Sequence, residues 1–179
     1  LLAGTEAALS RFVPNHGWLY LQMQGSTAYS DRREGAEALP VVLERLSDRI
    51  MAGNPLVTSI DGLYHFEHRT YPAIALREAL MNAFCHRDFR VGGPVLVKHF
   101  PEKLEISNAG GLIAGITPEN ILHHPPAARN PLLVQALLKL RLINRSNLGI
   151  SRMFESLLIE GKDPPIVSDV GEAVRVTFL

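Results

Sequence analysis

The sequence predicts a single α/β domain in which helices cover a β-sheet. Segments with the alternating pattern of strands are interleaved with segments of helical spacing, which favours this fold class. The chain has 179 residues, enough for one domain with a substantial core. Hydrophobic residues make up 46% and charged residues 20% of it, a balance that excludes a disordered or fibrous protein.

The N-terminal part of the chain alternates between helical and extended patterns. Pro40 is compatible with the helix expected at 37–51, because it falls in the first turn of that helix. A break follows at Gly53-Asn54-Pro55. In chain order we expect a helix end at 1–12, a strand at 18–24, a polar loop at 25–35, a helix at 37–51 and a strand at 63–70.

The C-terminal part contains a strong helical pattern, a hairpin and two further helices. Gly161 is placed to end the second of these helices. In chain order we expect a helix at 74–86, hairpin strands at 95–100 and 103–107, a glycine-rich loop at 108–115, one helical turn at 118–122, a well-buried helix at 132–142, a helix at 150–160 and a last strand at 174–179.

Charge and cysteine content bear on which partners the protein binds and in which cellular compartment it is expected. Lys and Arg total 18, as do Asp and Glu, so we do not expect nucleic acid to be bound by bulk charge. Cys85 is the single cysteine, which excludes an intrachain disulfide and suits a cytoplasmic protein. No apolar stretch approaches the ~18 residues of a membrane span. Both ends of the sequence look cut, so we expect a piece of a larger protein.

The helix expected at 74–86 carries the clearest chemical pattern. Glu78, Asn82 and His86 follow one another at one-turn spacing and therefore share a face. A carboxylate can orient or deprotonate a water, and a carboxamide oxygen is a hard ligand suited to Mg²⁺. The competing interpretation is an ordinary solvated face. Asn is a poor helix former in such an Ala- and Leu-rich helix, which weakens that alternative.

Three further segments admit both a structural and a ligand-binding interpretation. The paired glycines of 107–112 follow a strand and form either a plain turn or a close approach to a ligand. Asn130 is expected to cap the next helix with Pro131 at its first position, while Arg129 is placed to face an anion. Residues 145–150 form either a helix-entry loop or a phosphate-binding turn.

Taken in order, these segments resemble the C-terminal ATPase-like domain of RecG-related helicase-like proteins and Schlafen-AlbA-type transcriptional regulators. That domain is similar to the Bergerat (GHKL) ATP-binding fold. The resemblance rests on residues 75–88, 104–112, 129–131 and 147–150. It implies an α+β sandwich with a mixed, mostly antiparallel sheet. It also implies that 55–179 form the ATPase-like domain and that 1–54 are a connector, packed on the core, following an AlbA domain absent from this sequence.

The resemblance also implies roles for individual residues. Glu78 matches the water-activating glutamate and Asn82 the asparagine that binds Mg²⁺. The loop from Asn108 lies where relatives have an adenine-reading Asp-x-Gly-x-Gly, and Gly149 lies where lid glycines contact phosphates. We therefore expect Glu78 to be catalytic, Asn82 to hold Mg²⁺, and the nucleotide of Mg-ATP to be bound by Asn82, Asn108, Gly110, Gly111, Arg129 and Gly149.

Two departures from the pattern bear on activity. Asn108 replaces the adenine-reading carboxylate, and an amide is not a charged acceptor. The lid shows Gly149 without the usual run of glycines. The sequence also contains no Gly-x-x-x-x-Gly-Lys-Ser/Thr loop, so no motor of that type is encoded here.

Three functions follow as hypotheses. The first is an ATP-binding regulatory module, a weak ATPase at most, within a larger bacterial regulator or helicase-related protein. The second is a nucleotide-free structural or dimerisation module that keeps the fold as a homo-oligomer. The third is direct DNA binding, which the zero net charge disfavours for this fragment. We expect DNA to be contacted through domains absent from this sequence.

Overall fold

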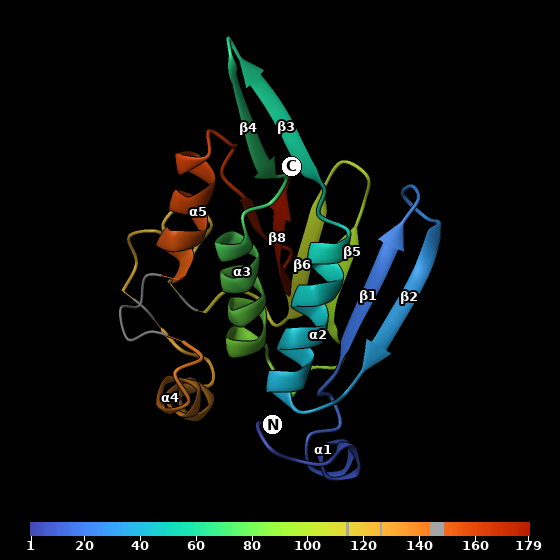
Figure 1. Cartoon of the computed structure of the whole chain (residues 1–179). Coiled ribbons are helices and arrows are strands. Elements are labelled where there is room, and N and C mark those ends of the chain that lie inside the picture. The colour runs from blue at the N-terminus through green and yellow to red at the C-terminus, as the bar shows by residue number, and fades with distance from the viewer. Residues whose placement is uncertain (114, 126, 144–148) are drawn as a thin grey trace.

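A six-stranded sheet with helices on one face forms the body of the molecule (Figure 1). The computed structural model describes residues 1–113, 115–125, 127–143 and 149–179. The strand order is β2-β1-β5-β6-β8-β7, and β1 pairs with β5 in parallel while every other neighbour is antiparallel. The strands are β1 (Trp18–Met23), β2 (Tyr29–Gly35), β5 (Val95–His99), β6 (Leu104–Ala109), β7 (Ile166–Asp169) and β8 (Ala173–Phe178). The predicted mixed, mostly antiparallel sheet covered by helices is confirmed.

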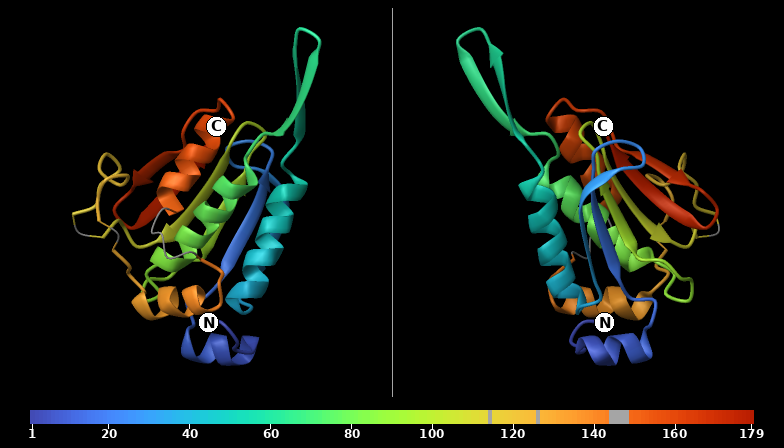
Figure 2. Two further views of the ribbon diagram at one scale, coloured as in Figure 1. Left: turned by 60° about the vertical axis from the view of Figure 1, so that its left-hand side comes forward. Right: turned by 90° about the vertical axis from the view of Figure 1, so that its right-hand side faces the viewer.

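Three helices pack side by side on that face, and two lie below its end (Figures 1 and 2). The packed helices are α2 (Leu39–Ala52), α3 (Ala73–His86) and α5 (Gly149–Ile159), and the lower ones are α1 (Glu6–Phe12) and α4 (Pro131–Lys139). Helix α3 lies between α2 and α5 and contacts β6, so it is buried on most sides. This central position explains why its sequence is apolar at almost every position except those facing the cavity described below.

The core lies between the sheet and these helices. Strand β5 alternates buried and half-buried positions, as expected for a strand with one face on the core. Tyr20, Val97 and Phe178 project from the strands, while Phe84 and Met153 project from α3 and α5, and all five side chains are almost completely buried. Residues from both halves of the chain therefore fill one core.

Strands β3 (Leu56–Asp61) and β4 (Tyr64–Arg69) form a separate hairpin that projects from the body (Figures 1 and 2). Gly62 supplies the left-handed backbone of its turn, with φ of 60°. The strand expected at 63–70 is confirmed as β4, whereas β3 was not predicted. The hairpin exposes large apolar side chains, namely Leu56, Val57, Ile60, Leu63, Tyr64 and Phe66.

Three expectations about local structure were wrong. Residues 25–35 were expected to be a loop, but β2 occupies most of this segment as an edge strand with largely exposed, charged side chains. Residues 118–122 form hydrogen-bonded turns instead of a helical turn, because the Asn120 side chain accepts from Thr117 N and donates to Gly115 O. Helix α4 buries only Leu133 and Leu137, since it lies below the end of the sheet and leaves its other sides open.

Candidate functional site

A cavity of about 340 Å³ lies between α3, the sheet and α5. Its walls come from α3, from β6, β7 and β8, from the start of α5 and from the stretch between β6 and α4. We call this stretch, residues 111–129, the roof segment; the structure describes all of it except 114 and 126. Most of the lining residues are aliphatic, and polar side chains from α3, β6, the roof segment and α5 join them, a mixture found in small-molecule sites.

One face of α3 forms a wall of this cavity. Glu78, Asn82 and His86, which the sequence placed on a single helix face, all line it. The Glu78 side chain is 12% exposed, and its Oε1 lies 3.5 Å from Nη1 of Arg77. Asn82 Nδ2 is buried and has no hydrogen-bond partner among the described residues. The helix therefore presents a carboxylate, a carboxamide and an imidazole to the cavity.

The N-terminus of α5 meets this wall at Gly149. A Cβ atom added to Gly149 would lie 2.9 Å from Oε2 of Glu78 and 3.6 Å from Oδ1 of Asn82. A larger residue would force the Glu78 carboxylate to shift, whereas Asn82 would be in ordinary van der Waals contact. The first backbone amides of an α-helix have no partner within the helix and carry its positive dipole end. A partial positive charge therefore lies directly beside Glu78 and Asn82.

The glycine loop after β6 lies at the other end of the cavity. Asn108, the penultimate residue of β6, lines the cavity, is 7% exposed, and donates from Nδ2 to Ala109 O at 3.2 Å. Gly111 also lines the cavity, and a Cβ there would lie 2.8 Å from Gly171 O. Gly110, with φ of 91°, packs against Asp88 and Arg129 and does not line the cavity.

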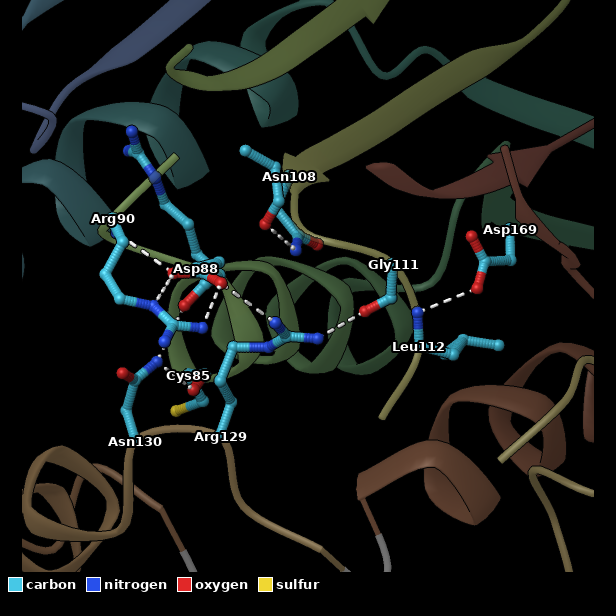
Figure 3. Close-up of polar contacts among 11 residues, drawn as sticks. Cys85, Asp88, Arg90, Asn108, Gly111, Leu112, Arg129, Asn130 and Asp169 are labelled. Carbon is cyan, nitrogen blue, oxygen red and sulfur yellow. Dashed lines mark hydrogen bonds and ion pairs between the residues drawn. The ribbon is translucent and has the colours of Figure 1, made fainter. Parts of the chain in front are cut away.

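Arg129 also lines the cavity, and its guanidinium joins two elements (Figure 3). Nη1 donates to Oδ2 of Asp88 at 3.2 Å, and Nη2 donates to the carbonyl oxygen of Gly111. Hydrogen bonds and charge from Arg90, together with the charge of Arg129, hold the pKa of the Asp88 carboxyl well below its usual range. Asp88 lies in a segment that the sequence singled out, yet no role was predicted for it.

Residues 92–178 match the family described as "Putative ATP-dependent DNA helicase recG C-terminal". The resemblance to the RecG C-terminal family is confirmed. The matched residues include β5, β6, the roof segment, α5 and the last two strands, so five of the predicted site residues fall within them. Glu78 and Asn82 on α3 lie upstream of the match.

The chain is also similar to a solved structure. The chain is similar to the DIP2311 protein from Corynebacterium diphtheriae, with a TM-score of 0.79 and 27% sequence identity. The similarity covers 91% of this chain and 34% of that one. The chain thus spans about a third of the length of this relative. No curated protein matches the chain.

Most of the RecG-type site residues expected from the sequence converge on one cavity. Glu78, Asn82, Asn108, Gly111, Arg129 and Gly149 line it, and Gly110 is the exception. The segment before Gly149, considered for phosphate contacts, lies at 145–148, outside the described residues. Among the residues that the structure describes, no group of three or more His, Cys, Asp or Glu side chains is arranged to hold a metal ion. No helix of the described ranges is long and apolar enough to cross a membrane.

Burial shifts the ionisation of two further cavity-lining groups. Burial and the charge of Arg129 lower the pKa of His86, so its imidazole is neutral at pH 7. Burial and the nearby Glu78 raise the pKa of Cys85 to about 12, so this thiol stays protonated. Neither residue carries a fixed charge into the cavity at neutral pH.

Asn130 has a different role from the one predicted. Its side chain makes no capping bond to α4. Instead, Nδ2 donates to the carbonyl oxygens of Cys85 and Arg87, at 2.9 and 2.8 Å, and so caps the C-terminus of α3. The last carbonyl groups of a helix have no partner within the helix, and those at the end of α3 bind the Asn130 side chain that was expected to cap α4. Pro131 does begin α4, as expected.

Proposed function

We propose that this domain binds a nucleotide, Mg-ATP, in the cavity between α3 and the roof segment. The contact of Gly149 with Glu78 and Asn82 is the observation that carries the proposal. It joins the amide end of an 11-residue helix to a carboxylate and a carboxamide inside one cavity. Helix N-termini bind phosphates, and Mg²⁺ binds through one or two protein oxygens together with phosphate oxygens.

The residues present fit such a group. The buried Nδ2 of Asn82 has no partner in the described part of the chain, so a ligand would complete its hydrogen bonding. The missing Cβ of Gly149 leaves backbone open to a close approach. A volume of about 340 Å³ lies within the range of small-molecule sites. The aliphatic lining near Asn108 suits a flat heterocycle.

Each polar group then has a distinct task. Asn82 holds the metal ion through Oδ1, and the α5 N-terminus binds phosphate. Bound Mg²⁺ would supply positive charge to the phosphate oxygens. Glu78 orients a water molecule and accepts its proton, the task for which a carboxylate at this position is suited. Asn108 contacts the base, as an amide in place of a carboxylate, and we propose that any hydrolysis is slow.

We further propose that the domain has a regulatory role in a larger helicase-related protein or transcriptional regulator. The chain spans about a third of the similar DIP2311 protein, which leaves room for other domains. Lys and Arg balance Asp and Glu, so DNA would be contacted by those other domains. A gel-shift with this domain at physiological salt should accordingly give no retarded band.

A thermal-shift titration tests nucleotide binding. ATP with Mg²⁺ should raise the melting temperature through mass action, by as much as ~2.7 kcal/mol of stabilisation at a hundredfold excess over Kd. Asn82→Ala should abolish the part of this rise in melting temperature that depends on Mg²⁺. Glu78→Gln should keep binding and abolish any hydrolysis, and Glu155→Gln on the exposed side of α5 is its matched control. A folded protein that shows no shift at millimolar ATP would refute the proposal.

The exposed hairpin favours a second candidate, a dimerisation module that has lost its nucleotide. Leu63 is 95% exposed and Tyr64 71% exposed, and apolar surface of this kind often marks an interface. Light scattering distinguishes the candidates. A mass of one chain together with ATP binding would reject the second, whereas a dimer without ATP binding would reject the first.

A further inference from the structure

The roof segment has its two ends tied together. Gly111 begins it and Arg129 ends it, and the Arg129 guanidinium donates to Gly111 O (Figure 3). The same guanidinium donates to Asp88, just beyond the C-terminus of α3. The roof is therefore a loop with joined ends, fastened to the end of the helix that forms the cavity wall.

We propose that Arg129 is a positioning residue: with Asp88 it fixes the roof segment over the cavity, and it does not bind phosphate. This inference rests on the proposed nucleotide site and assigns Arg129 a different task there from the anion contact expected from the sequence. Both Nη groups already donate to protein acceptors. The side chain is only 21% exposed.

Arg129 also lies at the wrong end of the cavity for phosphate. The α5 N-terminus touches α3 at Glu78 and Asn82. Arg129 instead contacts Asp88, beyond the other end of the helix, and its charge acts on His86. From Glu78 to His86 the helix rises about 12 Å at 1.5 Å per residue. A cation that far along α3 belongs to the roof and glycine-loop end of the cavity.

Asp88 is built to hold this contact. It is 7% exposed and accepts from the backbone N and the side chain of Arg90 at 2.8–3.0 Å, as well as from Arg129. Gly110 leaves room for it, since a Cβ there would lie 2.7 Å from the Asp88 Cβ. The hydrogen bonds from Arg90 thus hold the Asp88 carboxylate in position for its contact with Arg129.

Asp169 of β7 fastens the first end of the roof independently. Its carboxylate accepts from Leu112 N and from Gly171 N, both at 2.8 Å. Leu112 follows Gly111 directly, so both sides of this end are held: by Asp169 on the sheet and by Arg129 on α3. Loss of Arg129 should therefore free the far end of the roof more than the near end.

A ligand series separates positioning from phosphate binding. We expect Arg129→Gln and Asp88→Asn to raise Kd by the same factor, about tenfold, for adenosine, AMP, ADP and ATP, since losing a charged hydrogen bond costs this much. Arg129→Lys should behave like Arg129→Gln, because an ammonium cannot reach two acceptors as a fork does. Arg32→Gln, which removes the exposed partner of the Glu34 carboxylate on β2, is the matched control and should change little.

Hydrogen exchange of the nucleotide-free protein gives a second readout. Amides of the roof segment should lose protection at least tenfold in Arg129→Gln and Asp88→Asn, while α2 amides stay unchanged. A Kd for ATP that rises ten times more than that for adenosine, or a roof whose protection is unchanged, would overturn the inference. If the wild-type protein binds no nucleotide, the proposed function fails while the exchange result still decides the role of Arg129.

Discussion

Gly149 lies so close to Glu78 that a single added carbon would sit 2.9 Å from the carboxylate. We predict that Gly149→Ala lowers nucleotide affinity at least tenfold while the domain stays folded. Alanine has a higher helix propensity than glycine, by up to about 1 kcal/mol in a helix interior, so the melting temperature of the free protein should not fall. Calorimetric titration and thermal unfolding of the same samples measure the two effects.

The matched control is Gly92→Ala, because a Cβ at that surface position would meet nothing within 4 Å. Its affinity and melting temperature should both stay near wild type. If Gly149→Ala bound nucleotide as tightly as this control, the α5 N-terminus would not be part of the binding site.

Asn130 should contribute to stability through α3. Its Nδ2 pairs with two carbonyls at the helix end, so Asn130→Ala leaves both short of a partner. We predict a loss of about 1–3 kcal/mol in the free energy of unfolding, measured in urea. Gln135→Ala on the exposed side of α4 should change it by less than about 0.5 kcal/mol. A cost no larger than that of this control would mean that the cap is unimportant.

Stability should fall as the pH drops below 6.5. Burial lowers the pKa of His16, His86 and His99 in the folded protein, so the unfolded chain takes up protons first. The stability is thus complete above the unfolded pKa of about 6.5 and decreases as pH falls toward the lowered folded values. Each histidine should lower the free energy of unfolding by at most ~1.4 kcal/mol for each pH unit below 6.5.

Urea unfolding at a series of pH values measures this dependence. His99→Gln should flatten the slope of stability against pH between pH 6.5 and 5, whatever it does to stability at pH 7. An unchanged slope would show that His99 protonates equally in both states.

Cys85 should be inert in the native protein. Because its pKa is raised to about 12 by burial and by Glu78, almost no thiolate is present at pH 8. We predict that a thiol-specific disulfide reagent labels it at least a hundredfold more slowly in the folded protein than in urea. Rapid labelling of the folded protein would indicate that the cavity opens widely to solvent.

Local patterns were sufficient for the elements that pack on the core. Helix α3 and the β5–β6 hairpin were predicted closely, because their apolar residues repeat with the period of the element. Strands β2, β3 and β7 were missed since none of their described side chains is buried, so burial imposes no alternation on the sequence. The spacing of apolar residues therefore could not predict the edge of the sheet or the projecting hairpin.

The candidate site divides in the same way. Glu78, Asn82 and His86 share a face through helix geometry alone, and the structure gives all three to the cavity. The pair of Arg129 with Asp88 spans 41 positions and that of Leu112 with Asp169 spans 57. Such contacts depend on how distant segments meet, which one sequence does not encode locally. Asn130 is an example: its side chain binds the C-terminus of α3, which is distant in sequence, and not the start of the adjacent helix α4.

The parallel pairing of β1 with β5 ties together two stretches more than 70 positions apart. A shortened protein starting at residue 92, where the family match begins, would expose the backbone edge of β5 to solvent. It would also be left without α3, and with it one wall of the cavity. Recombinant versions of this domain therefore need the N-terminal strands and helices as well as the stretch that matches the family.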